Sequence, residues 1–234
     1  MGWANLTTWI LTTLREQSYR FPLLNSVGRF AGWGAHQAVR ILLAARNAMT
    51  KDRTRSVNAL NAIVRSNQLN IDARHKFVTT QIQQISQWRT RAEELSKAVA
   101  RTAARRLAQQ IQQLNQQLQD NNQQLVELVE VSEVAPLLEE KGFQAISAAK
   151  CLVSWSHHGR VNTEAEFASL AGVNPIPASS GNTPRYRLNR GGARELNSAL
   201  RMVAIVKATY DPETQRYVER DETKAKPIAR SDAV

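Results

Sequence analysis

The clearest hydrophobic pattern in the chain is a heptad repeat between residues 107 and 128. Apolar residues recur there at alternating spacings of four and three, and the positions between them are mostly glutamine and other polar residues. The repeat consists of Leu107, Ile111, Leu114, Leu118, Asn121, Leu125 and Leu128, in which Asn121 takes one apolar position. Such a seam is typical of a helix that packs against another helix, and a polar residue within it can fix the register. The partner is either an earlier helix of the same chain, in a hairpin, or a helix of a second molecule, in a coiled coil.

The surrounding sequence predicts a long helical region. No glycine or proline occurs from residue 35 to residue 135, and the absence of both helix breakers favours helix throughout. A first helix is expected over about 36–65. The polar stretch 66–72 should end it, because Asn and Asp side chains bond the local backbone in turns and caps. A short helix is expected to begin at Thr79 or Thr80.

Glycine and proline return at Pro136 and Gly142, and from there the pattern predicts a compact helical domain. Helices are expected over residues 145–155, over 163–171 with Thr163 as the N-cap, and over about 193–207. The proline-rich segment before the last helix is expected to be a loop. The charged residues after Pro212 are expected to form a frayed tail. The predicted fold is all-α, with an ill-defined lead-in at 1–34, a helical linker and coiled-coil arm at 35–133, a compact domain at 134–210 and a charged tail at 211–234.

Charge adds a class of partner to this picture. The chain carries a net charge of +11, and its pI near 10.4 makes a polyanion, first of all nucleic acid, the expected partner. Lys97, Arg101 and Arg105 stand at i, i+4 and i+8 and are expected to line a solvated helix face. A single cysteine, Cys151, excludes an internal disulfide framework and fits a reducing, cytoplasmic location. No stretch approaches the ~20 apolar residues that span a bilayer, so no membrane segment is expected.

The segment 171–192 holds the candidate chemistry. Ser179 and Ser180 precede a glycine in a loop with three prolines, and arginines follow. A serine hydroxyl becomes a useful nucleophile toward a phosphodiester where cations stabilise the charge that builds on the phosphate. From residue 179 to 207 the single acid is Glu195, against the basic residues Arg185, Arg187, Arg190, Arg194, Arg201 and Lys207. The segment is either a phosphate-handling site or a very basic turn.

Metal and nucleotide sites are not expected in this chain. His157 and His158 are adjacent and would point apart on a helix, and no Cys, His, Asp or Glu residues surround them at a ligand-like spacing. No glycine-rich nucleotide-binding loop occurs.

The second half of the chain resembles a known family in a series of motifs. They include Leu137-Leu-Glu-Glu-Lys-Gly142, Phe167-Ala-Ser-Leu-Ala-Gly172, Asn174-Pro-Ile-Pro-Ala-Ser-Ser-Gly-Asn-Thr183, Arg187-Leu-Asn-Arg-Gly-Gly192 and Leu196-Asn-Ser-Ala-Leu200. This series is similar to the carboxy-terminal domain of the bridge-RNA-guided insertion-sequence transposases, which are serine recombinases with a RuvC-like amino-terminal domain. The helical region, with 52–55, 58–60 and 71–74, resembles the linker of the same family.

The resemblance implies a function and a set of residues. In that family a serine attacks a DNA phosphate and forms a covalent phosphoserine link; Ser180 matches it here, with Ser179 as the alternative. The residues expected to hold nucleic acid are Lys150, Arg160, Arg185, Arg187, Arg190 and Arg194. The family also uses an acidic tetrad that binds a divalent metal, expected to be Mg²⁺, and a structured guide RNA that pairs with DNA.

Two departures from the family bear on activity. Residues 1–51 contain one acid, Glu16, so the acidic tetrad cannot be drawn from them, and the RuvC-like domain is expected to be absent. The family's glycine- and proline-containing turn is replaced by Gly142-Phe-Gln-Ala145. The sequence therefore suggests a truncated or remnant transposase with no cofactor site of its own.

Three functions follow as hypotheses. The first is a recombinase fragment that is active when a full-length transposase, joined through the helical arm, supplies the acids. The second is a catalytically inactive module that binds DNA or RNA, and the third is a coiled-coil interaction protein. The expected protein partner, bound through the helical arm, is either a second copy of the chain or a full-length transposase.

Overall fold

The computed structural model describes residues 32–225, apart from 70, 72–74, 76, 90, 157–159, 162 and 180–185. The described residues are mostly helical, with two short strands, which confirms the predicted all-α class. They form two compact units. One comprises residues 41–124, here called the arm, and the other comprises residues 32–40 and 125–225, here called the C-terminal unit.

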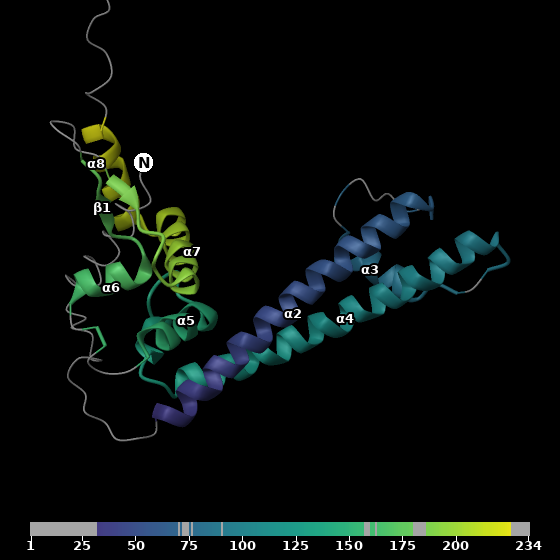
Figure 1. Ribbon diagram of the computed structural model, residues 1–234, viewed down its shortest axis with the longest axis horizontal. Helices are drawn as coiled ribbons and strands as arrows, with labels where there is room; N and C mark the ends of the chain where they lie inside the picture. Colours follow the sequence, from purple (N-terminus) through teal and green to yellow (C-terminus); the bar gives the residue numbers. More distant parts are fainter. Residues whose placement is uncertain are drawn as a thin grey trace, which may run out of the picture. The chain divides into compact units, whose positions relative to one another are not determined.

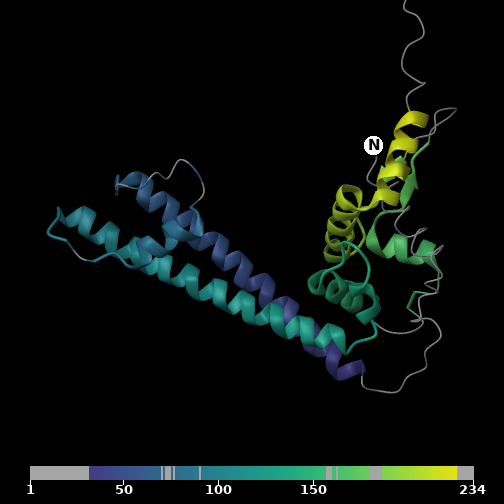
Figure 2. The same cartoon turned by 180° about the vertical axis from the view of Figure 1, so that it is seen from behind.

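The arm is built from three helices. They are α2 (Gly32–Ser66, which begins in the C-terminal unit), α3 (Thr79–Ser86) and α4 (Leu95–Glu130, which ends in it). Figures 1 and 2 both show α2 and α4 side by side, with α3 against them. The arm's core joins apolar side chains of all three helices: Leu60, Val64, Ile82, Ile85, Ala100, Ala104, Ala108 and Ile111. The three alanines recur every four residues on α4, so one face of that helix is small enough for its neighbours to pack closely.

The heptad seam of α4 packs against α2 of the same chain. The Asn121 side-chain amide donates a hydrogen bond to the carbonyl of Leu42 at 3.1 Å, and Asn121 is only 5% exposed. One turn further along, the guanidinium of Arg46 donates to the carbonyl of Leu118 at 3.1 Å. Because the partner numbers fall on α4 as they rise on α2, the two helices are antiparallel. The structure therefore adopts the hairpin, one of the two arrangements that the sequence left open.

The prediction that Lys97, Arg101 and Arg105 line a solvated face of α4 is wrong for Arg101. Arg101 is 7% exposed, donates from Nε and Nη2 to the Glu93 carboxylate at 2.9 and 2.7 Å, and lies 4.7 Å from the centroid of the Trp88 ring. The segment after α3 brings both partners to this guanidinium. The hydrogen bond from Arg101, although desolvation opposes it, lowers the pKa of Glu93.

In the C-terminal unit, other elements pack around helix α7. The elements are η2 (Ala135–Leu138), α5 (Ala145–Trp155), α6 (Glu164–Ala171), β1 (Pro175–Pro177), β2 (Tyr186–Leu188), α7 (Arg194–Tyr210) and α8 (Pro212–Ala225). The core includes Leu196, Leu200 and Val203 of α7 with Phe143, Cys151, Ala171 and Val173. As predicted, Thr163 caps α6, and its hydroxyl accepts from the Glu166 backbone N–H at 3.2 Å.

The charged tail is corrected by the structure, because residues 212–225 form helix α8. Asp211 caps it: one carboxylate oxygen accepts from the Thr214 backbone N–H at 3.1 Å and from its hydroxyl at 2.7 Å. Pro212 occupies the first helical position, where its missing N–H costs nothing. Thr214 is fully buried, and Tyr217 and Val218 pack toward α7. An N-cap aspartate followed by proline was a helix-start signal that the high charge of the tail obscured.

Candidate functional site

Two short paired strands flank the serine segment. Strands β1 and β2 are antiparallel, with Ile176 opposite Arg187 and the two prolines of β1 opposite Leu188 and Tyr186. A proline nitrogen carries no hydrogen, so the pair able to exchange both backbone bonds is Ile176 with Arg187. The prolines then place their missing donors on the outer edge of β1, where no ladder bond is lost. Residues 178–185, with both candidate serines, connect the strands.

Two glycines close the base of this hairpin. A Cβ atom on Gly192 would lie 2.3 Å from the backbone nitrogen of Gly172 and 2.4 Å from its Cα. Gly172 itself has a φ of +70° and ends α6 in the left-handed conformation that favours glycine. Beside this contact, the Ala193 N–H donates to the carbonyl of Leu170 at 2.7 Å. The backbone leaving the hairpin therefore lies directly on the backbone that leaves α6.

Two asparagines add side-chain hydrogen bonds at the same place. Asn189, just after β2, donates to the Asn174 side chain at 2.8 Å and to the Ser169 carbonyl at 3.4 Å. Its own side-chain oxygen accepts from the Gly191 N–H at 2.9 Å. Asn197 of α7 donates to the carbonyl of Ala171 at 2.9 Å. These contacts and the Gly172–Gly192 contact are together called the hairpin clamp below, and they tie the hairpin to the ends of α6 and α7.

Of the two candidate nucleophiles, only Ser179 lies in the described part of the chain. Ser179 is exposed, two residues after β1. Ser180 and Arg185 lie outside the described residues, so the geometry of the reacting hydroxyl itself stays a prediction.

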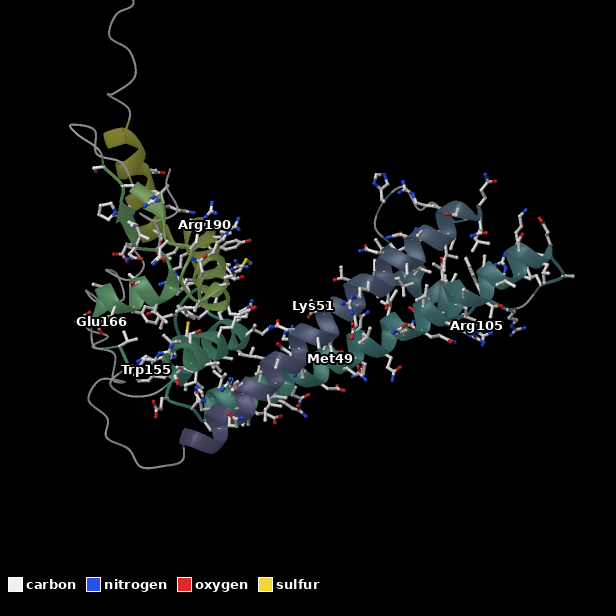
Figure 3. The ribbon with its side chains drawn as sticks, in the orientation of Figure 1. Met49, Lys51, Arg105, Trp155, Glu166 and Arg190 are labelled. Carbon is white, nitrogen blue, oxygen red and sulfur yellow. The ribbon has the colours of Figure 1, made fainter. Side chains whose placement is uncertain are left out.

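Three of the arginines that follow the serines lie in the described residues, on or just after β2 and at the start of α7. Arg187 on β2, Arg190 after it and Arg194 at the start of α7 are all exposed, and Figure 3 labels Arg190. No acid occurs between residues 179 and 194. Exposed guanidinium groups on a short, anchored stretch of chain suit the phosphates of a nucleic acid, which accept bidentate hydrogen bonds.

The remaining predicted contacts have other partners in the structure. Lys150 forms an ion pair with Glu195 at 2.7 Å, which links α5 to α7 and occupies the one acid of the segment. Arg160 is exposed and donates to the Ser154 carbonyl at 3.1 Å. Lys207 is 5% exposed and pairs with Glu140 at 2.8 Å, so it supports the core and does not belong to the basic surface.

Two further findings on reactive groups concern the described residues of the chain, which do not include His157 and His158. Burial raises the pKa of the Cys151 thiol to about 12, so it stays protonated and unreactive at neutral pH. Among the described residues, no three His, Cys, Asp or Glu side chains lie close enough together to hold a metal ion. The described part of the chain therefore does not fit the divalent metal that the family resemblance implies. Over the same residues no helix is long and apolar enough to cross a membrane.

Sequence reasoning missed the residues of the hairpin clamp. The sequence analysis considered hydroxyl and basic side chains. The position of the hairpin is instead set by Asn189, Asn197 and the contact between the two glycines. The available signals were the Gly191-Gly192 pair and the asparagine two residues before it, a composition typical of tight backbone approach.

Comparison with known proteins adds one finding. Residues 134–219 match the family model described as Transposase IS116/IS110/IS902 family. The match covers less than half of the chain, runs from the start of the C-terminal unit's compact helices into α8, and includes the whole hairpin and its clamp. A comparison with curated proteins found no match.

Proposed function

We propose that the chain is a DNA transposase component of an insertion sequence and that its β-hairpin presents a serine nucleophile to a DNA phosphate. The family match supports the transposase assignment, since it covers the whole serine segment. The observation that carries the site assignment is the hairpin clamp, with its Cβ-excluding contact of 2.3 Å between the two glycines. A nucleophile needs a defined position, and the anchoring of both strands at the ends of two helices supports such a position for the segment between them.

The proposed step uses Ser180, with Ser179 as the alternative. The serine oxygen forms a bond to phosphorus, and the bond from phosphorus to one bridging deoxyribose oxygen breaks. The serine hydroxyl gives up its proton, and the departing oxygen takes one. Arg187, Arg190 and Arg194 are proposed to hold the flanking phosphates and to offset the negative charge that builds in the transition state.

Further partners belong to the proposal. The described residues hold no metal-ligand cluster, so carboxylates for the divalent metal of the family would come from outside them, for example from a full-length transposase bound to the chain. A structured guide RNA is proposed as a second polyanionic partner. The net charge of +11 supports binding of nucleic acid in general.

The coiled-coil interaction hypothesis loses its main support. The leucine seam that suggested it packs against α2 within the chain, through contacts such as Asn121 with Leu42. A catalytically inactive nucleic-acid-binding module is a possible outcome of the test below, because its surface would be the same.

The test is covalent attachment to DNA on a denaturing gel. The chain is incubated with labelled insertion-site DNA and Mg²⁺, with and without a full-length family transposase and its guide RNA. The proposal predicts an adduct that is lost in Ser180→Ala, or in Ser179→Ala if that residue is the nucleophile. Ser198→Ala is the matched control, because Ser198 is an exposed serine on α7 outside the hairpin.

The other outcomes separate the hypotheses. Salt-sensitive binding with no adduct under either condition would leave a nucleic-acid-binding module. An adduct that survives loss of both serines would contradict the proposed nucleophile. Absence of any DNA or RNA binding would contradict the proposed function as a whole.

A further inference from the structure

The ion pair between Lys150 and Glu195 lies beside the arginines that follow the hairpin. Lys150 Nζ lies 2.7 Å from a Glu195 carboxylate oxygen, and the pair joins α5 to the first turn of α7, directly after Arg194. The neighbouring residues in sequence, Cys151 and Leu196, pack in the core of the C-terminal unit. Because this packing holds the backbone on both sides, the ion pair has a defined place at the margin of that core.

The two partners of this ion pair differ in exposure. The Lys150 side chain is 19% exposed, whereas the Glu195 side chain is 58% exposed. The ion pair of Lys207 with Glu140 is built differently, since its side chains are only 6% and 12% exposed. An exposed carboxylate gains little from an ion pair, because water competes for it. Glu195 can therefore leave its partner at small cost, whereas the largely covered Lys150 side chain keeps its place.

A DNA phosphate is a suitable replacement for the Glu195 carboxylate. Phosphate oxygens, like carboxylate oxygens, accept charge-assisted hydrogen bonds from a lysine ammonium group. Arg194, next to Glu195 in the chain, belongs to the surface proposed above to hold flanking phosphates. DNA bound there is tethered close to Lys150, and the high local phosphate concentration that tethering produces favours the exchange. Glu195 is the single acid from residue 179 to residue 207, so no other carboxylate of that segment competes for the ammonium group.

We propose that Glu195 occupies the phosphate position of Lys150 in the free protein and that a DNA phosphate displaces it on binding. Lys150 then supplies a phosphate contact that its ion pair masks in the free protein. Glu195 lowers the affinity of this surface for polyanions, because each of them must first break the ion pair. The inference rests on the proposed DNA binding of the C-terminal unit, and it does not depend on which serine reacts.

The test is a double-mutant cycle on DNA affinity, measured by fluorescence anisotropy with labelled insertion-site DNA at salt concentrations of about 50 to 200 mM. Lys150→Gln should reduce the slope of log K against log salt by about 1, because one phosphate contact is lost. Lys150→Arg keeps the positive charge and should keep the slope. Glu195→Gln should raise the affinity about two- to fivefold with the slope unchanged, since DNA no longer has to break an exposed ion pair.

The double variant distinguishes exchange from simple repulsion of DNA by the carboxylate. When Lys150→Gln is already present, Glu195→Gln should no longer raise the affinity, because no ion pair remains to be broken. Lys141→Gln is the matched control. Lys141 also pairs with an acid, Asp211 at 3.3 Å, but its own side chain is 63% exposed, and its loss should leave the slope unchanged. Circular dichroism of each variant checks that the fold is retained.

Two results would overturn this inference and leave the proposed function standing. An unchanged slope in Lys150→Gln would mean that no phosphate reaches the lysine. A gain in affinity from Glu195→Gln that is equal with and without Lys150 would mean that the carboxylate only repels DNA. In both cases the wild-type chain would still bind DNA with a steep salt dependence. Absence of salt-sensitive DNA binding in the wild-type chain would instead overturn the inference together with the DNA binding on which it rests.

Discussion

The contact between Gly172 and Gly192 makes a sharp prediction about the substitution Gly192→Ala. The new Cβ would lie 2.3 Å from the nitrogen and 2.4 Å from the Cα of Gly172, and 2.8 Å from the carbonyl carbon of Ala171. All three are backbone atoms at the end of α6, so no side chain can rotate to make room. The two segments must separate by about an ångström to reach ordinary contact distance.

The cost follows from what that separation breaks. Overpacking a well-fitted site costs ~1–3 kcal/mol, and each lost hydrogen bond adds ~1 kcal/mol. The bonds at risk are the short one from Ala193 to Leu170, at 2.7 Å, and the one from Asn197 to Ala171, at 2.9 Å. We therefore expect a loss of about 3–4 kcal/mol in the free energy of unfolding of the C-terminal unit. For a domain of this size that corresponds to a fall in Tm of roughly 10 °C or more.

The neighbouring glycine provides the control. A Cβ on Gly191 would meet only the Asn189 side-chain oxygen at 3.4 Å, an ordinary contact, and the φ of Gly191 is not positive. Gly191→Ala should change stability by less than ~0.5 kcal/mol. Thermal unfolding followed by circular dichroism compares the two variants directly. If Gly192→Ala is as stable as Gly191→Ala, the clamp does not exist as described, and the argument for a positioned serine fails with it.

Three further predictions concern single residues. Asp211→Ala removes the N-cap of α8 and should destabilise the C-terminal unit by about 1 kcal/mol at pH 7 in chemical denaturation. Burial alone would raise the pKa of Asp211, but the hydrogen bonds from Thr214 and the ion pair with Lys141 outweigh burial, so the pKa is lowered. The carboxylate therefore stabilises the fold above about pH 4, and the penalty of the variant should shrink as the pH falls below that. A penalty that is the same at pH 3 and pH 7 would contradict this. Arg101→Ala should destabilise the arm by roughly 2 kcal/mol, because it removes both the cation–π contact with Trp88 and the ion pair with Glu93. A variant that unfolds like the wild type would show that these contacts do not stabilise the arm. Arg194→Ala should weaken DNA binding and reduce the slope of log K against log salt by about 1, which fluorescence anisotropy at several salt concentrations measures, and an unchanged slope would remove Arg194 from the phosphate-binding surface.

Helix positions were predictable where local signals and packing agree. The helix at 145–155 was expected from its apolar run between breakers, and Thr163 was expected as a cap from its hydroxyl and the glutamate three residues on. The arm followed from the lack of glycine and proline. What periodicity could not decide was the partner of the leucine seam, because a heptad pattern is the same whether the second helix belongs to the same chain or to another.

The misses have physical reasons as well. Arg101 is one of three basic residues at regular helical spacing. That spacing does not reveal that Trp88 and Glu93, in the segment after α3, contact its guanidinium. Strand β1 was not predicted because two of its three residues are prolines. Proline is disfavoured in a strand unless its nitrogen faces the outer edge of the sheet. The hairpin clamp was invisible to a search for reactive side chains, because backbone contacts and amide groups build it.

The central claim is that the clamped hairpin delivers one of its serines to a DNA phosphate, and the most direct measurement is the chemical identity of the residue bound to DNA. The adduct formed with insertion-site DNA is trimmed with nuclease and digested with trypsin, which releases the peptide Val161–Arg185 containing both serines. Fragment mass spectrometry should place the nucleotide on Ser180 or Ser179, and the adduct should vanish in Gly192→Ala but persist in Gly191→Ala. A nucleotide on any other residue of the chain, or an adduct indifferent to Gly192→Ala, would contradict the account.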